Sequence, residues 1–466
     1  MKISVQIIID HENGAPTIVR PILELKREQL SSETLGITIN ESKLLLKTIQ
    51  SEVVDQQTEH YISKNKTCHQ CHKRLRFKGG SEIVYRTLFG KLHLKNPRYY
   101  KCSCLNKTNQ QKSLSLLSSL FPERISPELQ YIQTKYASLV SYGVTTNVLE
   151  DILPIHLNAS SVHRITHKTA KRLDSEIEED QCFYIKGCES DWHKLPSPES
   201  PITVGMDGGY IHARDGKNRK AGWFEAIVGK SLHDAKLSKR FGFVCKYDNK
   251  QKSRLNAMLQ KQNFQMNQGI TFLSDGGDTV RDLQYDISPC SEHLLDWFHI
   301  TMRITVMRQM TIDLPGTSKE ELHKELESIK WNLWHGNTAK ALDKIDNFAI
   351  EFYSDKPDKK SKKYKLWKWV DEFNTYIQSN KHLITNYAER HRYGEVISSS
   401  FVESTVNEVI SRRMVKKQQM RWTKEGAHRM IQVRTSTLND ELQDAFCRWY
   451  PKMEHKNIQT QNMRAA

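Results

Sequence analysis

Three carboxylates stand in settings that suit metal-ion chemistry. Asp207 ends the run V-G-M-D, Asp275 ends T-F-L-S-D, and Glu403 lies in a stretch of helical character. Each Asp closes an apolar strand and precedes two glycines, which let a phosphate backbone approach without a side-chain clash. Two magnesium or manganese ions on such oxygen ligands can activate one oxygen of a phosphodiester and stabilise the other. We therefore predict that these three acids are catalytic metal ligands, although each alone could be an ordinary turn or surface residue.

A second pair of polar residues follows in the run D-W-F-H. Asp296 and His299 are three positions apart, so they share one face if a strand passes directly into a helix. The histidine could contact a scissile phosphate or a flipped base, and a packed, hydrogen-bonded histidine is an equal alternative. We include both residues in the catalytic site without making either a primary metal ligand.

Four cysteines bracket a hairpin-like run in which Gly90 stands at the turn. Cys68 and Cys71 have the spacing of a zinc knuckle, and Cys102 and Cys104 are one residue closer together. Four thiolates brought together tetrahedrally make a closed structural zinc site. Two alternatives stay open: His69, His72 or His93 could replace one cysteine, or the thiols could be unrelated.

Two basic stretches could contact nucleic acid. Residues 142–177 have a helix, turn, helix pattern in which Ser160 or Ser161 can cap the second helix, and the outer face of that helix is basic. A solvated helix face without a role is the alternative. The second stretch follows Glu403, contains Trp422, and could hold a strand of DNA or be an ordinary helix end. The predicted DNA contacts are His163, Arg164, His167, Lys168, Lys171, Arg172, Arg412, Arg413, Lys416, Lys417 and Arg421.

The elements that must position these residues change along the chain. Strand-like runs occur at 201–207, 222–232, 240–247 and 269–275, with a helical stretch before the last run. This order predicts an α/β domain. From residue 301 to about 386 the pattern is helical: Ser318 and Glu321 have capping-box spacing, and apolar residues recur at helical intervals. Near the start, Asn40 is expected to cap a helix.

Composition restricts the class of partner. The chain has 466 residues, 70 Lys and Arg against 54 Asp and Glu, and a formal net charge of +16. This balance favours a polyanionic partner. No stretch is apolar enough to span a membrane, and the start lacks a signal-peptide pattern, so we expect no membrane association and a cytoplasmic location. Nine cysteines, an odd number, suit reduced thiols or metal ligands better than disulfides.

These motifs together resemble a known family. M-D-G at Asp207, S-D-G at Asp275, D-W-F-H, and E-S-T-V-N-E-V-I-S-R from Glu403 are similar to Mutator-like transposases, especially the ISKra-type enzymes of bacterial insertion sequences. The likeness extends upstream to C-H-Q-C and R-T-L-F-G-K and downstream to R-W-T-K-E-G-A-H-R-M. It implies a ribonuclease-H-like core with a helical insertion between the second Asp and the Glu, and it assigns the catalytic roles to Asp207, Asp275 and Glu403.

The expected fold is multidomain α+β. A zinc-ribbon-like segment and a helix-turn-helix precede a ribonuclease-H-like α/β core that an all-helical insertion interrupts. The expected segments are 1–62, an N-terminal strand and helix; 63–110, zinc-ribbon-like; 111–180, helix-turn-helix; 181–201, linker; 202–300, first part of the core; 301–394, helical insertion; 395–440, catalytic Glu helix and basic flank; and 441–466, C-terminal tail.

The expected function is DNA transposition. The protein would bind the ends of its insertion sequence, hydrolyse a phosphodiester with two Mg²⁺ or Mn²⁺ ions, and join the freed 3'-hydroxyl to target DNA. Its partner would be double-stranded DNA. Because strand transfer needs paired ends, we expect a homodimer or higher assembly on the DNA. When bound to DNA, the protein would be associated with the nucleoid. Two alternatives are a structure-specific nuclease on the same fold and a non-cleaving DNA-binding regulator.

Overall fold

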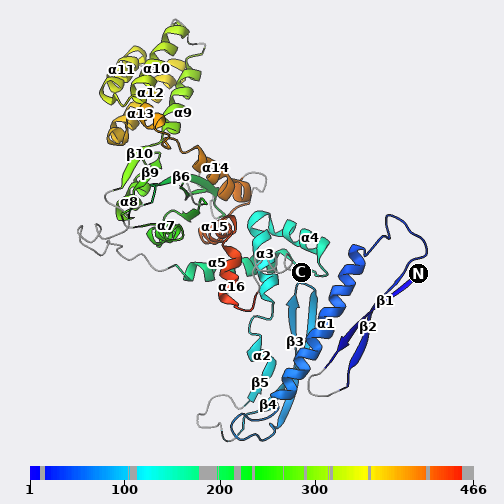
Figure 1. Ribbon diagram of the computed structural model, residues 1–466. Coiled ribbons are helices and arrows are strands. Elements are labelled where there is room, and N and C mark those ends of the chain that lie inside the picture. The colour runs from blue at the N-terminus through cyan, green and yellow to red at the C-terminus, as the bar shows by residue number, and fades with distance from the viewer. Residues whose placement is uncertain are drawn as a thin grey trace. The chain divides into compact units, whose positions relative to one another are not determined.

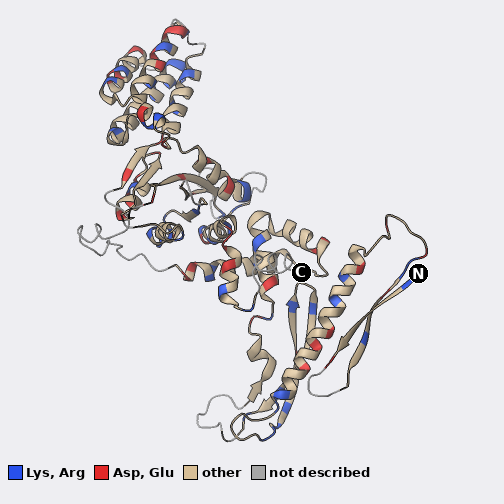
Figure 2. Cartoon of the chain, in the orientation of Figure 1, with Lys and Arg blue, Asp and Glu red and all other residues tan. Residues whose placement is uncertain are grey.

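Helices and three small sheets make up the described part of the chain (Figure 1). The computed structural model describes residues 1–10, 16–102, 104, 113–177, 197, 199–214, 222–233, 237–265, 267–287, 291–312, 314, 318–354, 358–415 and 420–453. The chain divides into two compact units, residues 1–169 with 440–466 and residues 170–439. Basic side chains occur in both units (Figure 2). None of the described helices combines the length and the apolar character needed to cross a bilayer.

The first unit begins with an antiparallel pair of strands, β1 (Lys2–Ile9) and β2 (Ile18–Lys26). Helix α1 (Ile39–Lys64) follows. Its N-cap is Thr38, whose hydroxyl accepts from the Glu41 amide while the Glu41 carboxylate accepts from the Thr38 amide. The expected cap at Asn40 is therefore wrong by two positions, because only Thr38 has a capping partner three residues further on.

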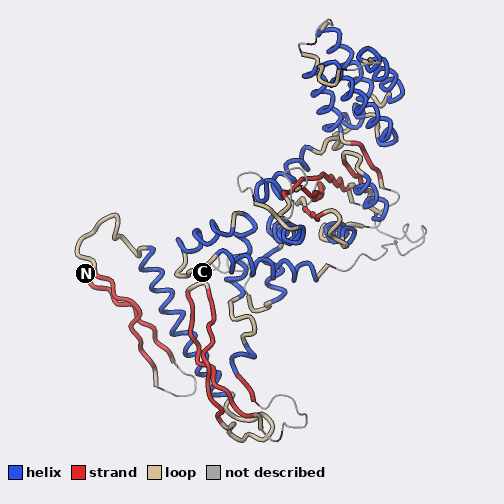
Figure 3. The backbone as a smooth tube through the Cα atoms, turned by 180° about the vertical axis from the view of Figure 1, so that it is seen from behind, coloured by secondary structure: helices blue, strands red, loops and turns tan. Residues whose placement is uncertain are grey.

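A long hairpin is the main sheet of this unit. β3 (Phe77–Thr87) and β4 (Gly90–Tyr100) pair antiparallel along their length, as Figure 3 shows, and β5 (Ser113–Ser115) adds a short third strand. The turn contains Gly90 at φ +138°, a conformation that side-chain-bearing residues rarely adopt. The predicted hairpin and its glycine turn are confirmed. Helix α2 (Leu116–Leu120) buries Leu117 against this hairpin.

Three further helices follow: α3 (Pro127–Leu139) and α4 (Tyr142–Ile152) belong to this unit, and α5 (Ala159–Ser175) belongs to it as far as Thr169. The start of α5 is capped by Asn158, whose Oδ1 accepts from the Ser161 amide at 2.7 Å. Ser160 and Ser161 are thus inside the helix, and the expected serine cap is wrong. The last described helix, α16 (Leu442–Trp449), packs on α3 through the rings of Tyr131 and Phe446, 5.7 Å apart.

The second unit is built on a five-stranded sheet of order β10-β9-β6-β7-β8. β6 pairs antiparallel with β7, and β7 with β8, whereas β9 and β10 run parallel to β6. The sequence prediction of three strands, a helix and a further strand is confirmed. The strands are β6 (Ile202–His212), β7 (Trp223–Leu232), β8 (Arg240–Val244), β9 (Ile270–Ser274) and β10 (Glu292–Leu295).

Helices cover both faces of this sheet. On one face, α7 (Gln251–Gln260) and α8 (Asp278–Ile287) bury apolar side chains against alternate residues of β6 such as Val204. The opposite face receives α14 (Ser400–Val406), the π-helix η3 (Asn407–Val415) and α15 (Lys424–Leu438). This second face is the one to which Asp207 belongs, because side chains alternate along a strand.

An all-helical part with its own core follows β10. The Ser318 hydroxyl accepts from the Glu321 amide at the start of α10, and the apolar residues that recur at helical intervals in this part are buried. Its helices are α9 (Trp297–Met310), α10 (Lys319–Trp334), α11 (Thr338–Phe352), α12 (Lys362–Asn380) and α13 (Tyr387–Arg392), with the 3-10 turn η2 (Lys381–Leu383).

Candidate functional site

Three aspartates belong to neighbouring segments of the sheet: Asp207 lies within β6, and Asp275 and Asp296 directly follow β9 and β10. β6 pairs with β9 as far as Gly205 opposite Leu273, and Asp207 and Asp275 each follow that last pair by two residues. On the other side of β9, Leu295 faces Ser274, so the next residue, Asp296, is level with Asp275. Adjacent strands are about 4.8 Å apart. The carboxyl ends of β9 and β10 therefore bring Asp275 and Asp296 to the level of Asp207.

Asp207 is the member of this group whose carboxyl pKa is clearly shifted from its ordinary value. Burial raises the pKa of its carboxyl, and the negative charges of Asp275 and Asp296 add to that rise. The charge of His299 and the Gly208 amide, which donates to Asp207 Oδ1 at 2.7 Å, act in the opposite direction. Negative charge at this edge is thus incompletely compensated, and a bound cation would relieve it.

Two glycines of β6 let the helix that carries Glu403 lie directly on the sheet. A Cβ atom on Gly205 would collide with Val402, and one on Gly209 would approach Ile410 Cδ1 to 2.8 Å. Both glycines share a face with Asp207, which lies between them. The close packing of α14 and η3 on this face therefore places the start of the Glu403 helix over the strand that carries Asp207.

The three proposed metal ligands are adjacent in the fold but are not drawn together at ligand distance. Asp207 is half-buried, and Asp275 and Glu403 are exposed. Among the described residues, the only group of three or more acids, histidines or cysteines whose ligand atoms all lie within 4.8 Å of one another is a cysteine quartet. The fold therefore supplies neighbouring elements for the trio, while the carboxylate oxygens stay further apart.

Asp296 holds the Glu403 helix in place instead of facing outward. It is completely buried and accepts from the amides of Phe298 and Ser399, both at 2.9 Å, and from the Ser399 hydroxyl. Ser399 is the N-cap of α14. His299 Nε2 lies 3.6 Å from the second Asp296 oxygen. With its oxygens thus engaged, Asp296 is a positioning residue, and the expectation that it acts directly in catalysis is not supported by its contacts.

Two further residues beside Asp275 were not found from the sequence. The Arg303 guanidinium lies 4.2 Å from the centroid of the Tyr376 ring, which joins α9 to α12. Burial, and then the charge of Asp275, raise the pKa of the Tyr376 hydroxyl, and the Arg303 charge opposes that rise. Arg303 is one turn beyond His299 on α9, so the two side chains project from the same side of that helix. Only helical spacing from His299 could have indicated Arg303.

The four cysteines form a compact quartet. The Sγ atoms of Cys68 and Cys104 are 3.3 Å apart, as are those of Cys71 and Cys102, and Cys104 is 3.6 Å from Cys71. Tetrahedral thiolates at a Zn–S distance of about 2.3 Å would be almost this close. The quartet can therefore hold a metal ion, and none of the nearby histidines is needed to complete it.

Backbone amides favour the thiolate form at two of the four cysteines, Cys68 and Cys102. The amides of Cys71 and Gln70 lower the pKa of Cys68 to about 6. The pKa of Cys104 is raised, because its thiol shares hydrogen bonds with Cys102 and Cys68. His93, a possible substitute ligand, instead pairs with Glu82.

The basic residues of α5 divide into outward-facing and internally engaged groups. His163, Arg164, Lys171 and Arg172 are exposed, as the helical pattern predicts. Lys168 is also exposed, but its Nζ lies 2.6 Å from a carboxylate oxygen of Glu123. His167 is half-buried, and its ring lies 3.9 Å from that of His163. Arg164 and Lys171 are thus the residues of this face best placed to meet a phosphate backbone.

The basic flank after Glu403 is partly internal. Arg413 is fully buried, with its guanidinium 5.3 Å from the ring of Trp422, which is itself 5% exposed. The prediction that Arg413 contacts DNA is therefore wrong, and Trp422 is a core residue instead of a stacking platform. Arg412 and Arg421 are exposed and remain candidates. Lys416 and Lys417 lie outside the described residues.

Comparisons with known proteins leave the family of the chain undefined. No protein-family model and no curated protein matches it. Among solved structures, a crystal structure of NurA with manganese aligns with 60% of this chain and 82% of that chain at 12% sequence identity and a TM-score of 0.11. A TM-score this low carries no argument about fold or activity. The functional argument therefore depends on the residues described above.

Proposed function

We propose that the protein is a DNA transposase of the Mutator-related, ISKra-type group, which cuts and joins DNA with divalent metal ions. The observation that carries the proposal is the convergence of three sequence motifs at one sheet edge. Asp207 lies in β6 and Asp275 directly follows β9, the strand that pairs with it, and the helix of Glu403 packs on Gly205 and Gly209, two residues to either side of Asp207. A carboxylate trio of this kind suits two-metal phosphodiester chemistry.

The topology supports a ribonuclease-H-like core in this proposal. Three antiparallel strands are followed by two parallel strands added on the other side of β6. The helical part α9–α13 stands between β10 and the Glu403 helix, where the resemblance to transposases implies an insertion. The same helical part supplies Arg303 and Tyr376 to the acidic edge, so an insertion here contributes residues to the site.

The donor set fits magnesium or manganese. All three proposed ligands are carboxylates, and burial, followed by the charges of Asp275 and Asp296, raises the pKa of Asp207, so a bound cation would favour its ionised form. Bound ions would activate the attacking oxygen and stabilise the leaving one. Within the chain, Asp296 fixes the start of the Glu403 helix, and the His299 ring and the Arg303 guanidinium would orient a scissile phosphate.

The other two parts of the proposal are a structural zinc ion and a DNA-binding face. Zinc suits the cysteine quartet, since four thiolates close its coordination and leave no position for substrate. The exposed basic residues of α5 suit the phosphates of double-stranded element ends. Joining two ends requires a dimer or higher assembly on DNA.

The test replaces each acid with its amide. Asp207→Asn, Asp275→Asn and Glu403→Gln should each lower cleavage and joining in magnesium by several orders of magnitude, because metal-supported charge stabilisation contributes several kcal/mol and about 1.4 kcal/mol is tenfold in rate. Binding to an end fragment should persist. Asp278→Asn is the matched control, because this exposed acid stands three residues after Asp275.

Product analysis separates the transposase from its alternatives. A transposase yields joined products as well as cut ends, a nuclease yields cuts alone, and a regulator yields neither. If a folded variant of the acidic trio cuts and joins within about threefold of the parent rate, well short of tenfold, that residue is not a catalytic ligand.

A further inference from the structure

A basic cavity lies within the first unit, away from the acidic edge. Its volume is ≈ 650 Å³, within the range of about 300–1,000 Å³ typical of small-molecule sites. The walls come from α1, the β3–β4 turn, α3, and the segment from the end of α4 to the first turns of α5. Residues distant in the sequence thus meet around one space.

The rim of this cavity is strongly cationic. Lys47, Arg86, Lys91 and Arg164 line it, all four are exposed, and none has an ion-pair partner among the described residues. The single acid of the lining is Glu150, whose Oε1 accepts from the Leu157 amide at 2.7 Å and pairs with His156. The hydrogen bond from the Leu157 amide, with further contributions from His156 and Lys43, lowers the pKa of Glu150. This acid fastens a loop and leaves most of the rim charge available to an anion.

The deep end of the cavity is apolar with one unsatisfied amide. Leu129, Ile125 and Ile165 are buried there and belong to one core cluster. Gln133 also lines the cavity and is 1% exposed, and its Oε1 has no hydrogen-bond partner among the described residues. A buried amide without a partner costs free energy unless a ligand satisfies it. Its Oε1 is inaccessible to solvent in the observed position, so the amide meets a base edge after the Gln133 side chain turns toward the cavity.

We propose that this cavity binds one nucleotide, with its phosphate on the cationic rim and its base toward Gln133. The ligand must be anionic at the outer end, flat and apolar along the walls, and able to hydrogen-bond at the inner end, and a nucleoside phosphate meets all three conditions. Glutamine pairs well with adenine edges, so an adenine nucleotide is the preferred probe. The nucleotide belongs either to a DNA strand or to a free mononucleotide.

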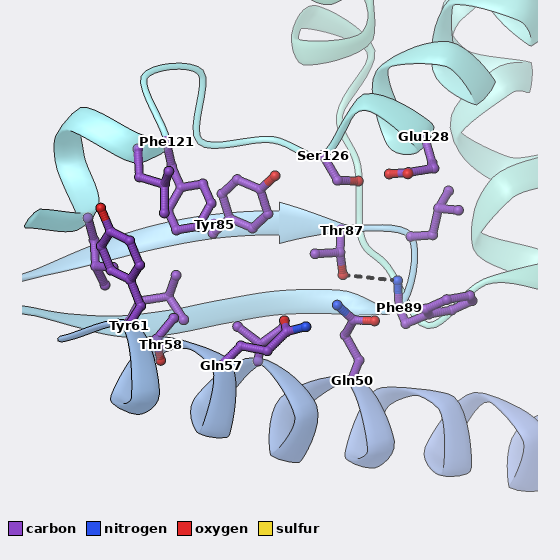
Figure 4. A pocket seen from close by; sticks show the side chains of 15 residues that line it. Gln50, Gln57, Thr58, Tyr61, Tyr85, Thr87, Phe89, Phe121, Ser126 and Glu128 are labelled. Carbon is purple, nitrogen blue, oxygen red and sulfur yellow. Dashed lines mark hydrogen bonds between the residues drawn. The ribbon is translucent and has the colours of Figure 1, made fainter. Parts of the chain in front are cut away.

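A second cavity in the same unit shows that the charge is particular to the first. Figure 4 shows this second space, of ≈ 630 Å³, between α1, the hairpin and the α2 segment. Aromatic side chains line it, among them Tyr61, Tyr85 and Phe121, and the lining contains Glu128 but neither Lys nor Arg. The two cavities are similar in size, so the basic lining of the first is not a general property of this unit.

The experiment measures binding without added magnesium, so that cleavage does not contribute. Deoxyadenosine monophosphate is titrated by calorimetry, and a labelled oligodeoxyadenylate by fluorescence anisotropy. The double variant Lys47→Ala with Lys91→Ala should weaken binding by about tenfold or more through loss of two phosphate contacts. The matched control is Lys64→Ala with Lys95→Ala, which removes the same charges from α1 and β4 outside the cavity. Gln133→Leu, checked by its melting temperature, tests the base end.

Each outcome decides the proposal. If the cavity variant loses binding of the mononucleotide, the natural ligand of the cavity is a free nucleotide. If it loses binding of the oligonucleotide alone, the ligand is a nucleotide within a DNA strand. Equal losses in cavity variant and control would show a diffuse charge effect and overturn the proposal. Parent-like affinity in Gln133→Leu would overturn it as well. Naming DNA as the source rests on the proposed function, whereas this assay is independent of cleavage, so the two can fail separately.

Discussion

At the scale of single residues, Arg254 is a buried charge away from Asp207, Asp275 and Asp296. It is 4% exposed and lies 2.7 Å from Asp248, with Asp174 as a second carboxylate partner and Gln432 as a further acceptor at 2.7 Å. A buried guanidinium is tolerated only where its donors are satisfied. This cluster ties the end of α5 to α7 and α15 within the second unit.

Asp174 gives this cluster a measurable pH dependence. Burial would raise the pKa of its carboxyl, but hydrogen bonds from His428 and Arg254 outweigh burial and hold the pKa well below its usual range. A lowered folded-state pKa stabilises the fold above the unfolded value of about 3.9 and loses that effect as pH falls toward the folded value. Asp174→Asn should therefore cost about 1 kcal/mol near neutral pH, since its side chain is 34% exposed and solvent screens the pair.

Urea unfolding at several pH values measures this effect. The difference between parent and Asp174→Asn should be constant above about pH 5 and shrink below about pH 4. The control is Asp286→Asn, which removes a surface partner of Lys252. A difference that is independent of pH down to about pH 2 would exclude Asp174 as the titrating group.

Individual site residues were predictable only where the local pattern identifies them. Asp275 directly follows β9, as its place at the end of an apolar run predicts, whereas the prediction that Asp207 also closes a strand is wrong, because β6 continues to His212. The strands themselves could be predicted from these runs. The role of Asp296 could not, because its partner Ser399 is 103 positions away and only the fold makes that hydrogen bond. Arg303 and Tyr376 meet across two helices for the same reason.

At the scale of elements, the strands and the apolar faces of the helices could be predicted from the sequence. Which side chains after Glu403 are buried and which are exposed could not. A regular α-helix was expected there, but α14 changes to π-helical geometry at Asn407. Hydrogen bonds from i to i+5 widen the turn, and residues beyond it rotate relative to an α-helix. Arg413 therefore enters the core beside Trp422. π-helical segments are frequent at functional sites, and this one follows the Glu403 turn directly.

In our proposal, a zinc ion bound by the cysteine quartet stabilises the end of the β3–β4 hairpin. Protein purified without chelator should contain one zinc per chain, and Cys68→Ser with Cys71→Ser should abolish it, because two thiolates are too few for a closed site. Elemental analysis measures the content. Cys245→Ser is the control, since the pKa of this partly buried thiol is raised to about 12 and it lies outside the quartet. Zinc near zero in the parent would contradict the assignment.

At the scale of the whole molecule, the net charge of +16 predicts salt-dependent binding to DNA. Arg164→Ala should weaken binding to element ends and reduce the slope of log affinity against log salt by about one. Lys168→Ala should change the slope less, because Glu123 already holds that ammonium at 2.6 Å. Anisotropy titrations over a salt series measure both slopes. Equal slopes for the parent and Arg164→Ala would place end recognition elsewhere.

The docking of α16 on α3 has a consequence for how the protein is made. The first unit combines residues 1–169 with 440–466, so its chain is completed only after all of residues 170–439 have been synthesised. At about 5–20 residues per second, the ribosome takes more than roughly ten seconds over that interval. During that time Tyr131 lacks Phe446, its ring partner. The second unit is continuous and can fold first, which reverses the usual order in which N-terminal domains precede C-terminal ones on the ribosome.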